Sequence, residues 1–301
     1  MKKFKSIAAA SVLGCSLILS SCGTSKGVAQ FVSLGTAVAG EVAAASGYTK
    51  TGAALSAGAG ALGTALVEIT PEDEYYIGRA VAATVLGNYT AYENPAQELY
   101  LNKICNAIVI NSDNPELFNG YHVKILDSQE VNAFATSGGH IFVTRGMIDY
   151  TGSEDELAAV IAHEVSHIHL KHSLMAIKAS RYTNLVTTSA LAAASTTSSE
   201  ETAHLVGDIF TTMVNNGYSQ TQEFQADSKA LSLMADAGYN PEAMKSLLTK
   251  MNEKTQHNGF YKTHPSPGLR ITNLNNNVYG KLKLPPDTCA DRVERFNAVM
   301  R

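Results

Sequence analysis

The residues that decide the fold are His163-Glu164-Val165-Ser166-His167, near the middle of a chain of 301 residues. Two histidines four positions apart lie on one face of a helix, so both imidazoles can reach a single metal ion. The glutamate between them can accept a proton from water at that place. The pattern therefore predicts a helix that carries a zinc site for hydrolysis.

The flanking sequence predicts that this helix runs from about residue 153 to 172. Ser153 with Glu156 three residues later predicts a capping box, and further acidic residues suit the positive end of the helix dipole. Apolar residues recur at helical spacing and mark a buried side: Leu157, Val160, Ile161, Val165 and Ile168. The motif falls within or beside this apolar arc, where uncompensated burial of a carboxylate and two imidazoles is costly. A divalent cation would compensate them; two core histidines bonded to the backbone are the alternative.

His169 and His172 extend the histidine cluster along the sequence. In a continuous helix they lie roughly 120° and 180° around the axis from His163, so neither can reach the same ion. We expect both to be polar residues on the exposed side, near the helix C-terminus.

A zinc hydrolase of this type needs a third protein ligand and an open fourth position. The best candidate is Glu223, four residues before Asp227 on a second predicted helix that ends near Gly238. Asp227 would hold the free ring nitrogen of one zinc histidine and fix its tautomer. For Glu223 taken alone, a solvated helix carboxylate is the alternative.

Four segments of the chain carry a resemblance to a known family. They are Asn132-Ala133-Phe134-Ala135 with Gly138-Gly139-His140-Ile141-Phe142-Val143, the His163 to His167 motif, Glu223 to Asp227 with Ala237-Gly238-Tyr239, and His264-Pro265-Ser266-Pro267 with Arg270-Ile271. In this order they resemble the zinc metalloendopeptidases that include the HtpX heat-shock protease and the CAAX-prenyl endopeptidases, in the soluble periplasmic lipoprotein branch (LoiP-like). The similarity runs from about Glu72 to Val278.

The resemblance implies site residues by position. The zinc ligands would be His163, His167 and Glu223, with one Zn²⁺ per chain, and the general base would be Glu164. Residues Asn132, Ala133, Phe134 and Ala135 would form the strand that borders the cleft, whose free edge would pair with an extended substrate backbone.

His264 corresponds in the family to a histidine near the metal. It would either stabilise the oxyanion of the reaction or occupy the fourth zinc position in a resting, latent enzyme. A turn histidine before Pro265 is the alternative to both. Arg270 would support this loop or the cleft, with an exposed helix charge as the alternative.

The N-terminus predicts export and lipidation. Three lysines precede an apolar segment at residues 7–19, and Leu19-Ser20-Ser21-Cys22 follows as a bacterial lipobox. We expect residues 1–21 to be removed and Cys22 to be lipidated; an uncleaved anchor or lipidation at Cys15 is the weaker alternative. Because Gly23 rather than Asp follows, we expect the outer membrane, facing the periplasm, in a Gram-negative cell, and the outer face of the plasma membrane in a Gram-positive one.

Export leaves one pair of cysteines in an oxidising compartment. Cys105 and Cys289 would then form a disulfide, with two free thiols as the alternative.

The remaining composition is that of an ordinary globular domain. Without the three signal lysines, 20 basic residues (23 − 3) face 27 acidic ones, and no basic run or aromatic array points to nucleic acid. Residues 22–70 are rich in Ala, Gly and Ser and predict a tether, with closely packed small-faced helices as the alternative. We expect the metallopeptidase domain at 71–280 and a tail at 281–301 that ends in a short helix.

The order of expected elements gives the fold class. Helices at about 72–91 and 95–111 precede a strand at 121–127, two strands around Gly138-Gly139, the metal helix, and further helices to about 278. This order predicts an α+β fold: a mostly helical zincin-type domain with a small sheet packed on the metal helix.

Together these predictions describe a lipid-anchored zinc endopeptidase that cleaves misfolded or membrane-associated envelope proteins. Its partners would be protein or peptide substrates, the membrane through the lipid, and the envelope assembly machinery. One alternative is a non-proteolytic chaperone or assembly factor for outer-membrane proteins that uses the same cleft. Another is a structural lipoprotein in which the glycine-rich segment is the functional part.

Overall fold

A computed structural model describes residues 69–175, 206–253, 263–264, 266–279 and 290–301. Apart from Ile69 and Thr70, these residues belong to one unit, which spans Pro71–Ala176 and Val206–Arg301. The signal segment, Cys22, nearly all of the expected tether and Cys289 lie outside the described residues. The domain limits, the lipidation and the disulfide therefore stay predictions, and Cys105 itself is buried.

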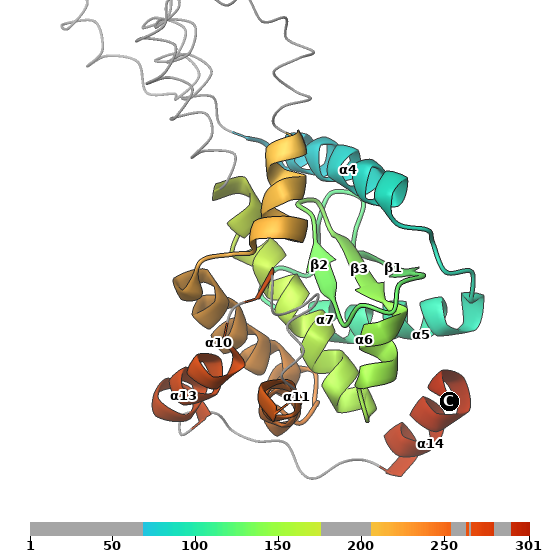
Figure 1. The fold of residues 1–301 in the computed structure, drawn as a ribbon, viewed down its shortest axis with the longest axis vertical. Helices are drawn as coiled ribbons and strands as arrows, with labels where there is room; N and C mark the ends of the chain where they lie inside the picture. Colours follow the sequence, from blue (N-terminus) through green and yellow to red (C-terminus); the bar gives the residue numbers. More distant parts are fainter. Residues whose placement is uncertain (1–68, 176–205, 254–262, 265, 280–289) are drawn as a thin grey trace, which may run out of the picture. The chain divides into compact units, whose positions relative to one another are not determined.

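The described chain is mostly helical, with one small sheet (Figure 1). In chain order the elements are α4 (Pro71–Asn88), α5 (Pro95–Ile110), β1 (His122–Leu126), β2 (Ala133–Ala135), β3 (His140–Thr144), α6 (Arg145–Tyr150), α7 (Glu154–His169), the π-helical turn η1 (Thr212–Asn216), α10 (Gln220–Asp236), α11 (Glu242–Glu253), α13 (Pro267–Asn277) and α14 (Ala290–Met300). The predicted α+β class is confirmed. Within the described residues, no helix combines the length and the apolar character needed to cross a bilayer.

The sheet has the strand order β1-β3-β2. Strand β1 runs parallel to β3, with His122 opposite His140, and β2 runs antiparallel to β3, with Phe134 opposite Phe142. The turn between β2 and β3 contains Gly138, whose φ is 77°. A Cβ at this position would lie 2.6 Å from the Cα of Tyr75 in α4, so the close approach of this helix to the turn requires glycine.

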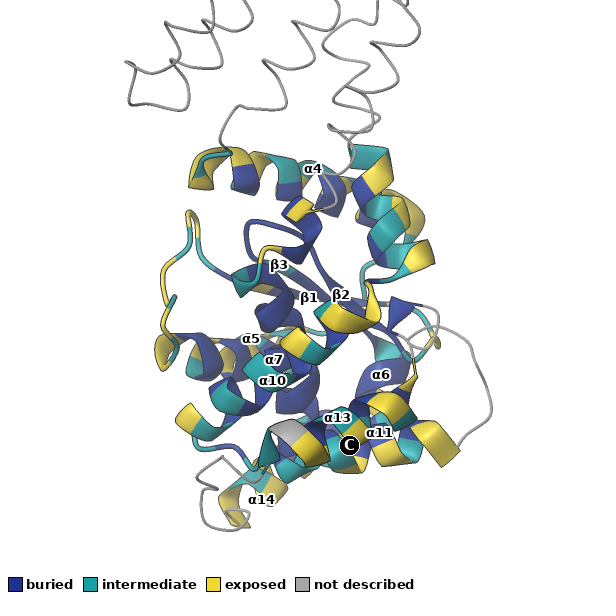
Figure 2. Cartoon of the chain, turned by 90° about the vertical axis from the view of Figure 1, so that its left-hand side faces the viewer, coloured by how far each residue is buried: buried dark blue, intermediate teal, exposed yellow. Residues whose placement is uncertain are grey.

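The centre of the domain is α7, the helix that carries the His163 to His167 motif. Every residue from Glu154 to Ile168 is buried, so the helix has no exposed face and not only the apolar arc is covered. It packs against α5, α10, α11, β2 and β3, and Figure 2 shows buried residues through this helix and the strands. A helix buried on all sides must be surrounded by the other elements of its domain. The predicted packing of the sheet on the helix that carries the motif is confirmed.

The start of α7 forms only half of the predicted capping box. The Ser153 hydroxyl accepts a hydrogen bond from the Glu156 backbone N–H at 3.2 Å. The Glu156 carboxylate, however, does not return to Ser153. It accepts hydrogen bonds from the Gly152 N–H, 2.7 Å away, and from Ser246 and Lys250 of α11. The carboxylate thus bonds both the residue before the N-cap and two side chains of α11, so this acid joins two helices.

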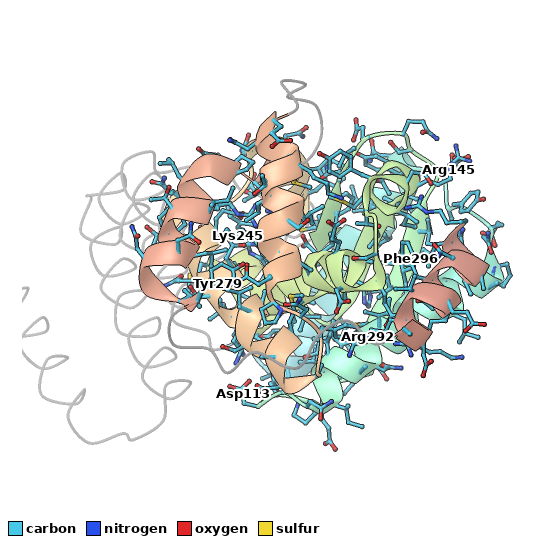
Figure 3. The ribbon with its side chains drawn as sticks, turned by 90° about the horizontal axis from the view of Figure 1, so that it is seen from below. Asp113, Arg145, Lys245, Tyr279, Arg292 and Phe296 are labelled. Carbon is cyan, nitrogen blue, oxygen red and sulfur yellow. The ribbon has the colours of Figure 1, made fainter. Side chains whose placement is uncertain are left out.

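The expected short helix near the C-terminus is α14, and it docks on the same end of α7. Arg292 donates to Asp155 Oδ1 at 2.8 Å, and Arg295 donates to the carboxylate of Glu154. Phe296 lies in the core, and Figure 3 shows it beside Arg292 on this helix. The first turn of α7 is therefore held by ion pairs from two other helices.

Candidate active site

Three segments bring four metal-binding side chains to one place. Helix α7 supplies His163 and His167, α10 supplies Glu223, and His264 lies shortly before α13. One ligand atom from each of the four residues lies within 4.8 Å of the others, and all four side chains are buried.

The distances between these atoms fit a single metal ion. His163 Nε2 lies 3.1 Å from His167 Nε2 and 3.2 Å from His264 Nδ1. The Glu223 carboxylate oxygens lie 3.4 Å from each of the two motif histidines and 3.0 Å from His264 Nδ1. In a tetrahedral site with bonds of about 2.0–2.1 Å, neighbouring ligand atoms are about 3.3 Å apart.

Hydrogen bonds alone do not account for this cluster. His163 Nε2 faces two other ring nitrogens and a carboxylate oxygen, although a ring nitrogen has at most one hydrogen to donate. Burial raises the pKa of Glu223, but the charge of His264 and the hydrogen bonds of the three histidines outweigh burial and hold its pKa well below the usual value. The four residues therefore offer nitrogen and carboxylate ligands of the type that zinc takes.

Glu164 lies beside the cluster with no hydrogen bond to either carboxylate oxygen from any residue that the structure describes. His264 Nε2 lies 3.6 Å from Glu164 Oε1. Burial raises the pKa of Glu164, and the charges of His264 and His163 offset only part of this effect. A buried carboxylate with a raised pKa and unpaired oxygens is suited to accept a proton from water and to return it.

Behind His163, Asp227 and Arg270 form a buried ion pair. Asp227 Oδ1 lies 3.0 Å from His163 Nδ1, and Arg270 donates to both Asp227 oxygens, at 2.7 and 2.5 Å. Arg270 also lies 3.4 Å from Glu223 Oε2. Its side chain is only 1% exposed, so the alternative of an exposed helix charge is wrong. This pair fixes the orientation of one candidate ligand and contacts a second.

The expected positions of His169 and His172 on an exposed side are wrong. His172 is buried, and its Nδ1 lies 2.8 Å from His167 Nδ1; the His169 ring lies 2.8 Å from the Tyr121 hydroxyl. The prediction assumed a continuous helix to residue 172. In fact α7 ends at His169, and Lys171 adopts a φ of 55°, so the helix is interrupted and a new helical turn begins at His172. Neither histidine belongs to the four-residue cluster.

The β2 edge lies next to His264. The Thr144 N–H donates to Asn132 O, and the Thr136 N–H donates to His140 O, so the alternating pattern directs the backbone of Ala133 away from β3. No strand lies on that side of β2 in the described part of the chain.

The chain itself occupies this edge at Ala133. His264 Nε2 lies 3.4 Å from Ala133 O, and the Ala133 N–H donates to the Asn132 side chain at 2.9 Å. Thr263 also donates to the Asn132 side chain at 3.3 Å. Phe134 instead packs in an aromatic group with Tyr89 and Phe142. A peptide backbone could pair at Ala133 only after His264 moves.

Tyr218 is the residue at this site that the sequence did not indicate. Its ring stacks on His167, with centroids 4.2 Å apart and an angle of 20° between the planes. It stands next to Ser219, the N-cap of α10, where no local pattern marks it as functional. Its backbone N–H donates to Thr263 O at 3.3 Å, and a Cβ at the preceding Gly217 would lie 2.1 Å from the same oxygen.

The chain is similar in sequence to a peptidase family and to several proteins named as proteases. A sequence model of peptidase family M48 matches residues 95–278, which include all four residues of the cluster. The beta-barrel assembly-enhancing protease of Yersinia pestis is 26% identical over 218 residues, which cover 69% of this chain and 44% of that protein. The mitochondrial metalloendopeptidase OMA1 of Schizosaccharomyces pombe is 31% identical over 184 residues, 58% of this chain and 51% of that protein.

A shorter relative is matched over more of its length. Metalloprotease LoiP of Escherichia coli is 29% identical over 187 residues, which cover 60% of this chain and 71% of that protein. By contrast, the chain spans less than half of the length of the beta-barrel assembly-enhancing proteases that it matches. The family model, which matches residues 95–278, covers the candidate site.

Proposed function

The chain belongs to peptidase family M48, and on this premise we propose that it is a zinc-dependent endopeptidase of the bacterial envelope. The observation that carries the proposal is the buried cluster of His163, His167, Glu223 and His264 with the unpaired Glu164 beside it. We further propose that Cys22 carries a lipid anchor and that the substrates are misfolded or membrane-associated envelope proteins.

His163, His167 and Glu223 would hold the zinc ion, with Asp227 and Arg270 fixing the ring of His163. Zinc would supply Lewis acidity, which polarises a peptide carbonyl and makes water more acidic. The fit rests on the donor set and its distances, which match a tetrahedral site.

Glu164 would perform both proton transfers. As the oxygen of water bonds to the carbonyl carbon, Glu164 accepts one proton of that water, and the carbonyl π electrons move to the carbonyl oxygen. When the C–N bond breaks, the nitrogen takes the bonding pair and the proton from Glu164. The products are a new carboxyl terminus and a new amine, and Glu164 is ionised again.

We propose that the structure corresponds to a latent state in which His264 takes the fourth metal position. Its Nδ1 lies as close to the other candidate ligands as they lie to one another, while its Nε2 faces Ala133 O on the β2 edge. One displacement of His264 would then open the fourth position and free the backbone edge for an extended substrate. Stabilisation of the oxyanion by His264, the other role implied by the resemblance, would require its ring to return to the site after substrate has bound.

The proposed location rests on the lipobox at Cys22. The name "beta-barrel assembly-enhancing protease" joins proteolysis with assembly in that relative. That name supports the second candidate function, an assembly factor for outer-membrane proteins. Such a factor could bind its clients without cleaving them while the metal site stays closed.

The test is metal content and cleavage measured on the same protein. We expect about one zinc per chain by elemental analysis and cleavage of an unfolded test protein at bonds mapped by mass spectrometry. Glu164→Gln should keep the metal and lose cleavage. Undiminished cleavage by this variant would refute the role of Glu164. Zinc binding without cleavage, in the wild type and in His264→Ala, would favour the assembly factor.

A further inference from the structure

The Tyr218 hydroxyl is an anomaly among the buried tyrosines of the described chain. The others, Tyr100, Tyr121 and Tyr239, each donate a hydrogen bond to an oxygen atom. Tyr218 is 8% exposed, and its hydroxyl has no hydrogen-bond partner among the described residues. Leaving a buried hydroxyl unpaired destabilises a folded protein, so a retained unpaired hydroxyl calls for a partner that binds from outside.

Contacts on two sides fix this side chain against the candidate active site. The Tyr218 ring stacks on His167, and its backbone is tied to Thr263, the neighbour of His264. The phenol O–H is a hydrogen-bond donor, and in this position it has nothing to donate to among the described residues.

Glu164 and Tyr218 form a complementary pair of unpaired groups. The Glu164 carboxylate can only accept hydrogen bonds when ionised, the phenol is available to donate one, and the two do not bond to each other. A reaction that needs both groups is the addition of water to a carbonyl: one group takes a proton from water, and the other stabilises the charge on the carbonyl oxygen.

We propose that Tyr218 is a catalytic residue whose hydroxyl donates a hydrogen bond to the substrate carbonyl oxygen while negative charge develops on it. The inference rests on the proposed function and adds a residue to it. No proton is transferred from Tyr218; the hydrogen bond strengthens as the C=O bond becomes a C–O single bond and weakens again when the C–N bond breaks. Tyr218 thus performs the oxyanion role that the resemblance offered to His264, which in this structure contacts Glu223 and Ala133.

The first test uses the metal-free full-length chain. Tyr218→Phe keeps the ring stack and removes only the unpaired hydroxyl, so the Tm should stay equal or rise. The matched control is Tyr239→Phe, which removes a hydroxyl that donates to Glu154 Oε1 at 3.1 Å, and its Tm should fall by about 2–4 °C. An equal fall in Tyr218→Phe would show that the hydroxyl already has a partner in the resting protein, which overturns the proposal.

The second test uses the metal-loaded chain and a peptide that spans a mapped cleavage site. Tyr218→Phe should lower kcat by about 100-fold, with KM and zinc content unchanged, whereas Tyr239→Phe should leave kcat unchanged. A phosphinic peptide of the same sequence, which mimics the tetrahedral state, should bind Tyr218→Phe about 100-fold more weakly, while the cleavage products bind equally. An unchanged kcat, or equal weakening of both kinds of ligand, would overturn the proposal.

These measurements separate this inference from the proposed function. If neither the wild-type chain nor His264→Ala cleaves any protein, the endopeptidase proposal fails. The Tm comparison and the binding of the phosphinic peptide then still decide whether the Tyr218 hydroxyl is an unpaired donor for a tetrahedral oxyanion.

Discussion

The two halves of α7 bury polar groups in opposite ways. In the first turn, Glu154, Asp155 and Glu156 are buried, and each carboxylate is bonded to a cationic side chain of α11 or α14. Two turns later Glu164 is equally buried, and its oxygens have no such bond within the described chain. The comparison teaches that burial of charge does not by itself mark a functional site. A buried charge that the protein leaves unpaired does.

The histidines of the second half show the same contrast on a smaller scale. His163 is held from behind by an anion, Asp227, which Arg270 in turn neutralises. His167 is held by another imidazole, that of His172. The two candidate ligands therefore differ in the charge behind them, and substitutions should distinguish them.

The largest expected effect comes from the unpaired carboxylate. Glu164→Gln should lower kcat by about 1000-fold or more, because the proton acceptor is lost, while the Tm of the metal-free protein changes by less than about 2 °C. Peptide hydrolysis and thermal unfolding of one preparation check both statements. A marked fall in Tm would mean that Glu164 has a structural partner and would break the contrast between the halves.

The anion behind His163 should matter for both metal binding and folding. Asp227→Asn would leave the charge of Arg270 less well compensated in a buried place and should lower the free energy of unfolding by about 3 kcal/mol. Zinc affinity should fall about 10- to 100-fold, because the ring of His163 is no longer fixed. Urea unfolding and competition with a zinc chelator measure the two effects. Asp236→Asn, at the exposed end of the same helix, is the control and should change neither.

The paired half should behave in the opposite way to Glu164. Glu154→Gln removes the charge that Arg295 contacts and should lower the free energy of unfolding by about 2 kcal/mol, with kcat unchanged. The control is Glu294→Gln on the exposed side of α14, which should stay within about 0.5 kcal/mol of the wild type. A large loss of activity in Glu154→Gln would show that the two halves are coupled.

The same carboxylate gives a pH dependence with a defined sign. Burial raises the pKa of Glu154, but the hydrogen bonds from Arg295 and Tyr100 outweigh it, so the folded-state pKa lies below the unfolded one. The folded state thus binds fewer protons, and the stability from Glu154 is present above a pH of about 4.3 and lost as the pH falls through the folded-state pKa. The difference in Tm between wild type and Glu154→Gln should therefore shrink below about pH 4. A constant difference would contradict the ion pair.

The smallest effect is expected from His172. His172→Ala removes the group that contacts His167 Nδ1 and should weaken zinc binding about 10-fold. The matched control is His169→Ala, which also removes a largely buried imidazole but one that contacts Tyr121. Equal zinc affinities in the two variants would mean that His172 serves packing only.

The sequence predicted those features that a local pattern records. The spacing of His163 and His167 gave the metal helix, and the resemblance indicated which later acid, Glu223, lies near it. The strand at about 121–127 and the α+β class followed from the same order of elements. These features are local because they depend on the period of a helix or strand and on its neighbours in the chain.

The sequence did not predict the features that depend on contacts between distant segments. The ring of His172 lies over His167 because of the turn at Lys171, which a continuous helix does not predict. The carboxylate of Glu156 does not make the predicted capping-box bond to Ser153 but pairs with Lys250, 94 residues later. Tyr218 is positioned by stacking on His167 and by a backbone hydrogen bond to Thr263. Neither contact produces a periodic pattern in the sequence.

Gly217 carries a consequence for how much sequence change the protein tolerates. Its φ of 73° and the position of Thr263 O, 2.1 Å from any added Cβ, mean that even alanine there would push the segment of His264 off the start of α10. In a library of single substitutions selected for peptide hydrolysis, this residue should be as intolerant as the four that meet at the cluster. Gly217 contributes no side chain to the reaction. The distance between its own segment and the segment of Thr263 nevertheless depends on its being the smallest amino acid.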